Sequence, residues 1–117
     1  MIISLMALTL VISGCTGLKP VETVTEAFES GNASQCESIE DVNIRSTCYA
    51  GAAVTGGDVN VCTKIVREND RVTCIVGVAV STMNESLCDN INESKRRDSC
   101  HKVVQKIQGS SSEELTD

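Results

Sequence analysis

Apolar side chains recur along this chain at the spacing of a helix. The clearest run follows the i, i+3, i+4, i+7, i+8 pattern that puts side chains on one face of an α-helix. It consists of Val72, Ile75, Val76, Ala79 and Val80. The alternation of apolar and polar residues expected of a half-buried strand fits this segment poorly. The pattern therefore predicts an all-α protein.

The pattern returns three times at a constant period, in units of equal length that cover residues 32–57, 58–83 and 84–109. Every unit opens on a good helix N-cap and shares an isoleucine, an arginine and two cysteines. When the three units are aligned, each shared position forms a column. Apart from the cysteines, these columns are Asn32, Asp58 and Asn84; Ile39, Ile65 and Ile91; Arg45, Arg71 and Arg97. A period of this length predicts a stack of equivalent supersecondary units.

Each unit is predicted to be a helical hairpin with a short first arm and a longer second arm. In unit three these arms are residues 85–90 and 93–108. Residues 21–30 align with the second arm of a preceding unit but lack its cysteine, which predicts an N-terminal capping helix ended by Gly31. Val21, Val24 and Phe28 would form its buried face. Residues 110–117 are polar and acidic, and we expect them to be disordered.

Six of the seven cysteines lie inside the repeat, where a shorter gap within each unit alternates with a longer gap between units. Within one unit the two cysteines lie at similar distances before and after the predicted turn. Antiparallel arms would then bring their Cα atoms within the reach of a disulfide. Pairing between units would instead leave a height mismatch of roughly 6 Å. The spacing predicts three internal disulfides: Cys36–Cys48, Cys62–Cys74 and Cys88–Cys100.

The chain begins with an uncharged apolar run, residues 1–14, that is short for a membrane span. The run leads into Ile12-Ser13-Gly14-Cys15, which resembles the lipobox of prokaryotic lipoproteins, although Lys or Arg is missing after Met1. The resemblance implies that residues 1–14 are a signal peptide, that Cys15 carries the lipid, and that residues 15–20 are a tether. The protein would be exported and anchored to the outer face of the cell membrane. A plain secretory signal and an uncleaved anchor are alternatives, and both would also export residues 16–117.

The composition disfavours several kinds of chemistry. A net charge of −6 argues against nucleic-acid binding, which depends on clustered Lys and Arg. The cysteines are too widely separated for the tight pairs of a zinc site and His101 is the only histidine, so no metal or other cofactor is expected. The C-x-x-C motif of redox enzymes is also missing. His101 is therefore interpreted as a surface or packing residue, and the protein is not expected to be an enzyme.

The arginine column is the one charged feature that all three units share. Arg45, Arg71 and Arg97 could form a ladder that binds acidic polymers or carboxylates. The favoured interpretation is that they pair with nearby acids, because Asp41, Glu68 and Glu93 lie three or four residues earlier. Asn32, Asn84 and Asn92 each begin an Asn-x-Ser sequon, although the first two are already explained as helix caps.

The clearest unit reads Ser86-Leu87-Cys88, then Ile91, then Arg97-Asp98-Ser99-Cys100. It resembles a tandem cysteine-pair repeat of uncharacterised exported archaeal proteins, and the resemblance covers residues 32–109. It implies a surface protein of paired-cysteine α-hairpins and brings no activity. The expected function is a membrane-anchored structural or interaction module with an unknown protein or cell-envelope partner. The alternative is an exported thiol-disulfide redox protein that acts on client cysteines.

Overall fold

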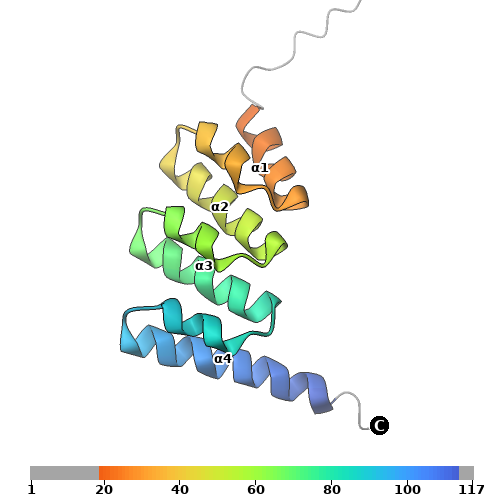
Figure 1. Ribbon diagram of the computed structural model, residues 1–117, viewed down its shortest axis with the longest axis vertical. Helices are drawn as coiled ribbons and strands as arrows, with labels where there is room; N and C mark the ends of the chain where they lie inside the picture. The colour runs from red at the N-terminus through yellow and green to blue at the C-terminus, as the bar shows by residue number, and fades with distance from the viewer. Residues whose placement is uncertain (1–18, 114–117) are drawn as a thin grey trace, which may run out of the picture.

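The structure is a computed structural model that describes residues 19–113. This part of the chain contains helices and loops but no strand, which confirms the all-α prediction (Figure 1). The long helices are α1 (Lys19–Ser30), α2 (Val42–Gly56), α3 (Glu68–Ser81) and α4 (Ser94–Glu113). Short 3₁₀ helices precede the last three: η1 (Ala33–Ser38), η2 (Val59–Lys64) and η3 (Glu85–Asn90).

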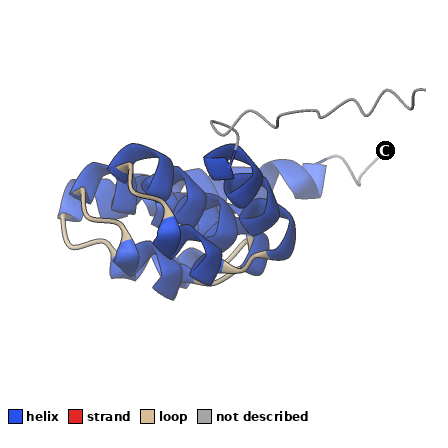
Figure 2. Ribbon diagram, turned by 90° about the horizontal axis from the view of Figure 1, so that it is seen from above, coloured by secondary structure: helices blue, strands red, loops and turns tan. Residues whose placement is uncertain are grey.

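Three hairpins follow α1, and each consists of a 3₁₀ helix and the α-helix after it. The 3₁₀ helices begin at Ala33, Val59 and Glu85, which are equivalent positions of the three units, as predicted. The long helices lie side by side in chain order, with the 3₁₀ helices alongside them (Figure 1). Seen along the stack, short loops join the helices (Figure 2). The sequence placed the first arms correctly, but they are 3₁₀ helices of six residues each, which is longer than most 3₁₀ helices.

Side-chain caps set the start of each 3₁₀ helix. Asn32, Asp58 and Asn84 accept a hydrogen bond from the backbone N–H two residues later, at 3.1, 3.0 and 3.2 Å. At the other end of each 3₁₀ helix, the isoleucine of the repeat donates its backbone N–H to the carbonyl of the first cysteine and buries its side chain. These interactions explain why both residue types recur with the period of the fold.

The core is a column of cysteines, small residues and aliphatic side chains that runs through all the hairpins. The predicted disulfides Cys36–Cys48, Cys62–Cys74 and Cys88–Cys100 are confirmed, with Cα–Cα distances of 5.7, 5.6 and 5.7 Å. All six cysteines are at most 1% exposed. Each disulfide therefore joins the two arms of one hairpin at the centre of the core.

Three predicted features of the ends differ in the structure. Among the α1 residues whose burial the structure describes, 22–30, the fully buried one is Ala27, whereas Phe28 is 40% exposed and its ring lies over Gly51 of α2. Ala27 is the α1 residue that belongs to the core cluster, and Val24 packs against that cluster. At the other end, α4 continues through Gly109 to Glu113, so residues 110–113 are helical and not part of a disordered tail. The predicted tether, residues 15–20, is also shorter at its end, because Lys19 and Pro20 already belong to α1. Residues 114–117, the predicted signal peptide and residues 15–18 lie outside the described residues.

Candidate functional site

The disulfides are inaccessible to another molecule in this fold. Because their cysteines are at most 1% exposed, a client thiolate could not reach the sulfur atoms without opening a hairpin. Each bridge is therefore a structural staple in the folded protein. The remaining cysteine, Cys15, lies outside the described residues, so its predicted lipid attachment stays a prediction.

The arginine column closes the turn of each hairpin. Arg45, Arg71 and Arg97 donate from Nη1 to the carbonyl of the isoleucine six residues earlier, at 2.8, 2.8 and 3.1 Å. The same nitrogen lies 3.4 Å from the next carbonyl in every unit. The expected pairing with acids is wrong: none of these arginines forms an ion pair within the described residues, where Asp41 instead caps α2 and Glu93 pairs with Arg96. The backbone carbonyls take the place that the acids were expected to fill, and a binding role for this column stays a prediction.

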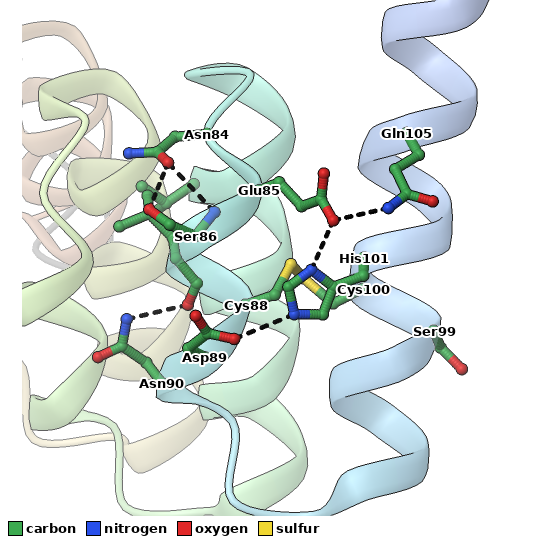
Figure 3. The surroundings of a disulfide bond; sticks show 12 residues. Asn84, Glu85, Ser86, Cys88, Asp89, Asn90, Ser99, Cys100, His101 and Gln105 are labelled. Carbon is green, nitrogen blue, oxygen red and sulfur yellow. Dashed lines mark hydrogen bonds and ion pairs between the residues drawn. A yellow bond between two sulfur atoms is a disulfide. The ribbon is translucent and has the colours of Figure 1, made fainter.

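His101 lies between two carboxylates at the last unit's outer surface (Figure 3). Its Nδ1 is 2.9 Å from Glu85 Oε1 and its Nε2 is 3.1 Å from Asp89 Oδ1. Gln105 donates to the same Glu85 oxygen at 2.7 Å. A neutral imidazole can donate from only one nitrogen, so this arrangement suits the protonated ring. The hydrogen bond with Glu85 is the main cause that raises the pKa of His101, and Asp89 adds to it.

Sequence reasoning interpreted His101 only as a surface or packing residue and missed this cluster. The repeat does contain a signal for it. Residues 85 and 101 occupy the columns of Val59 and Ile75, an apolar pair in unit two. Both positions become polar in unit three, which places Glu85 opposite His101 on the two arms of one hairpin. Coordinated replacement of an apolar pair by an acid and a histidine would have predicted the ion pair.

A large open hollow lies between α2 and α3 at the edge of the core. Its volume is about 520 Å³. A smaller hollow of about 250 Å³ occupies the equivalent place between α3 and α4. The larger one is lined mostly by apolar and small uncharged residues: Phe28, Asn43, Ser46, Thr47, Ala50, Gly51, Val54, Thr55, Arg67, Asp70, Thr73, Cys74 and Gly77. The smaller one is lined by Val72, Val76, Lys95, Arg96, Ser99, Cys100 and Val103.

The size difference follows from the sequence at equivalent positions. Around the larger hollow α3 contributes Gly77, where α4 has Val103. On the opposite wall α2 contributes Ser46 and Ala50, and the corresponding residues of α3 are Val72 and Val76. Smaller side chains on both walls therefore leave the first interface more open. Neither hollow was predicted, because the space depends on side-chain sizes across two units and not on any motif within one.

The charged groups around the two hollows differ. At the larger hollow, Arg67 Nε lies 2.7 Å from Asp70 Oδ2, an ion pair that lacks hydrogen-bond alignment. At the smaller hollow, Arg96 pairs with Glu93 at 2.8 Å. Lys95 is exposed, and among the described residues no acid lies within ion-pair distance of it. The second hollow therefore has an unneutralised positive charge on its rim.

The described part of the chain contains no group of three or more His, Cys, Asp or Glu side chains that could hold a metal ion. Among its helices, none combines the length and the apolar character needed to cross a membrane. Comparisons of the chain with protein-family models, with curated proteins and with solved structures gave no match.

Proposed function

We propose that this protein is an exported, lipid-anchored helical repeat module that binds a protein or another component of the cell envelope and catalyses no reaction. The observation that carries this proposal is the stack of three equivalent hairpins, each held by a buried disulfide and flanked by open apolar hollows. Repeat stacks offer extended surfaces built from equivalent positions, which suits binding. Three structural disulfides are typical of a protein that matures in an oxidising, extracellular environment.

The lipid anchor is proposed from the resemblance of residues 12–15 to a lipobox. The disulfides add support, because they pair all six cysteines of the repeat and leave Cys15 as the odd one. A lone exported cysteine calls for a separate role, and lipid attachment supplies one. The redox alternative is disfavoured by the burial of every sulfur in the repeat, since a dithiol enzyme must expose the sulfur that its client attacks.

The test is the intact mass of protein extracted from membranes of its own cells, measured before and after reduction. We expect a chain that begins at Cys15, carries the added mass of a lipid, and gains six hydrogen atoms on reduction. The variant Cys15→Ala should leave the membrane fraction while keeping its three disulfides. A chain that retains residues 1–14 with an unmodified Cys15 would contradict the anchor. Reactive thiols in the folded, unreduced protein would contradict the structural role of the bridges.

A further inference from the structure

We infer that the two hollows beside α3 form one docking surface for an acidic amphipathic helix of a partner protein. This inference rests on the interaction function proposed above and adds the surface and the chemistry of the partner. Three properties carry it: the shape of the hollows, their spacing along the stack, and the charge at one end.

The larger hollow has the size and lining of a site for large apolar side chains. Its volume of about 520 Å³ falls in the range of known ligand-binding clefts. Phe28 and Val54 form part of its wall and are 40% and 37% exposed. Phe28 is the only phenylalanine of the chain, so its partly exposed ring is a large apolar surface that the fold itself leaves uncovered.

The second hollow repeats the first at the next helix interface. Thr73 lines the larger hollow and Ser99, its equivalent in unit three, lines the smaller one. Neighbouring packed helices are separated by roughly 10 Å, so the two hollows are about that far apart. Side chains seven residues apart on one face of an α-helix are also separated by about 10.5 Å. A partner helix with large apolar residues at i and i+7 could therefore fill both hollows.

A helix suits this surface better than an extended peptide. An extended segment needs hydrogen-bond partners for its backbone, which binding proteins usually offer as a sheet edge. The described residues contain no strand, and the backbone groups of α2 and α3 are used within those helices. A bound helix satisfies its own backbone and places only side chains into the hollows.

The charge of the surface favours an acidic partner. Although the whole chain carries a net charge of −6, α4 has three exposed lysines without an acid in ion-pair distance among the described residues. They are Lys95, Lys102 and Lys106. Lys95 is the one that lines a hollow. The nearby acids Asp70 and Glu93 are paired with Arg67 and Arg96, so acidic residues beside the apolar face of a partner helix would meet Lys95 as the unpaired charge of this surface.

The experiment selects peptides of about 16 residues from a random library against the folded, disulfide-bonded repeat domain within the full mature chain. We expect the selected peptides to be acidic, to carry apolar residues at i and i+7, and to become helical when bound. Nuclear magnetic resonance should place the largest amide shifts at Gly51, Thr73 and Gly77. Vesicles of anionic phosphatidylglycerol serve as the competing probe.

Matched variants separate this surface from the rest of the molecule. Thr73→Trp fills the larger hollow and should weaken the binding of the selected peptides at least about tenfold. Thr63→Trp places the same side chain on η2, away from both hollows, and should leave binding unchanged. Lys95→Glu should weaken binding several-fold. Its control is Lys102→Glu, which makes the same charge change on the same helix but outside the hollows, and which should have little effect on binding. Thr47→Trp provides a second block of the larger hollow if Thr73→Trp fails to fold.

Several results would overturn the inference. They are the absence of any enrichment, enrichment of basic peptides, equal effects of the two tryptophan variants, or tighter binding to anionic vesicles through the same residues. Self-association of the wild-type chain that Thr73→Trp abolishes would assign the surface to a second copy instead. None of these results changes the mass test of export and lipid attachment, so failure here is distinguishable from failure of the proposed function.

Discussion

In each unit an arginine donates hydrogen bonds to the backbone carbonyls of the hairpin turn. The geometry of its guanidinium group explains why all three units have arginine at this position. One guanidinium nitrogen reaches two successive carbonyls, at 2.8 and 3.4 Å in units one and two. These carbonyls belong to the C-cap isoleucine of the 3₁₀ helix and to the residue after it, so they have no partner within that helix. The planar guanidinium keeps its charge and holds a fixed direction, whereas the ammonium of lysine is a mobile point charge.

Because the column arginines bond to backbone carbonyls, two nearby arginines of unit two should contribute differently to the stability of the protein. Arg71→Met should lower the free energy of unfolding by about 1–3 kcal/mol, because the carbonyl of Ile65 loses a charged donor. Arg67→Met removes only a surface ion pair with Asp70 and should cost less than about 1 kcal/mol. Urea unfolding of both variants measures the difference. Equal costs would show that Arg71 contributes no more than a surface charge.

His101 should make the stability of unit three depend on pH. Its pKa is raised in the folded protein, chiefly by the hydrogen bond with Glu85, so folding favours the protonated ring. The stabilisation is complete below the unfolded pKa of about 6.5 and is lost as the pH rises through the raised folded value. His101→Gln should remove this dependence, and since His101 is the only histidine, the comparison is clean. The measurement is urea unfolding from pH 5 to 9, and equal slopes for both proteins would contradict it.

At the scale of elements, a glycine lets α1 and α2 pack closely. A Cβ added at Gly51 would collide with the ring of Phe28, whereas nothing lies within 4 Å of one added at Gly109. Gly109→Ala should stabilise α4 by up to about 1 kcal/mol through helix propensity. Gly51→Ala should lose that gain, because the end of the partly exposed Phe28 ring must move aside.

A double-mutant cycle isolates the contact between Gly51 and Phe28. In a Phe28→Ala background the collision disappears, and Gly51→Ala should then be neutral or stabilising, as at Gly109. Thermal unfolding of the four proteins gives the coupling energy. A coupling energy near zero would mean that α1 is held to α2 by other contacts, such as that of the buried Ala27.

The disulfides should contribute a large part of the stability of each hairpin. Each joins cysteines at a sequence separation of 12, and closing so short a loop is worth about 3 kcal/mol of unfolded-chain entropy. Replacing Cys62 and Cys74 together with alanine should therefore lower stability by about 2–5 kcal/mol. The bridge of unit two lies between two hairpins, so its loss should loosen both neighbours. Circular dichroism should show a marked loss of helicity on full reduction, and unchanged helicity would show that packing alone holds the stack.

The repeat made the fold predictable from the sequence to an unusual degree, and it also explains what was missed. Columns of caps, isoleucines and cysteines predicted the number of hairpins, their limits and the pairing of the disulfides. Contacts between residues at different positions of the repeat were harder to predict. The acids expected for the arginines had the right spacing, but the turn brings a backbone carbonyl closer. Phe28 aligned with apolar positions, yet only the packed helices show that Ala27 is buried and that small residues open a hollow beside Gly77.

At the scale of the whole molecule, unit three has polar residues on the surface that, in unit two, is apolar and faces the next unit. In unit two, Val59, Ile75 and Ala79 pack in or against the core, and α3 contacts η3 and α4 of unit three. The equivalent residues of unit three are Glu85, His101 and Gln105, which bond to one another at the outer surface. His101 is partly exposed, whereas Ile75 is buried. At the other end, α1 exposes Glu22, Glu26 and Glu29. Such polar outer faces are what repeat arrays need to stay soluble.

Restoring the apolar face should therefore make the chain associate with itself. The triple variant Glu85→Val, His101→Ile and Gln105→Ala gives unit three the residues of unit two at these positions. Without a fourth hairpin to cover it, the new apolar surface should drive concentration-dependent association. Sedimentation velocity measures the shift in mass relative to the unmodified chain.

The control for this variant places the same three apolar side chains where no unit is expected to stack. Glu40→Val, Glu68→Ile and Asn69→Ala are exposed positions at the turn side of the hairpins. This control should sediment like the unmodified chain, because its apolar groups do not form a face that matches another unit. Equal association of the two triple variants would mean that added hydrophobicity alone drives self-association. Association of the terminal variant alone would show that Glu85, His101 and Gln105 keep this surface of unit three from packing against another hairpin.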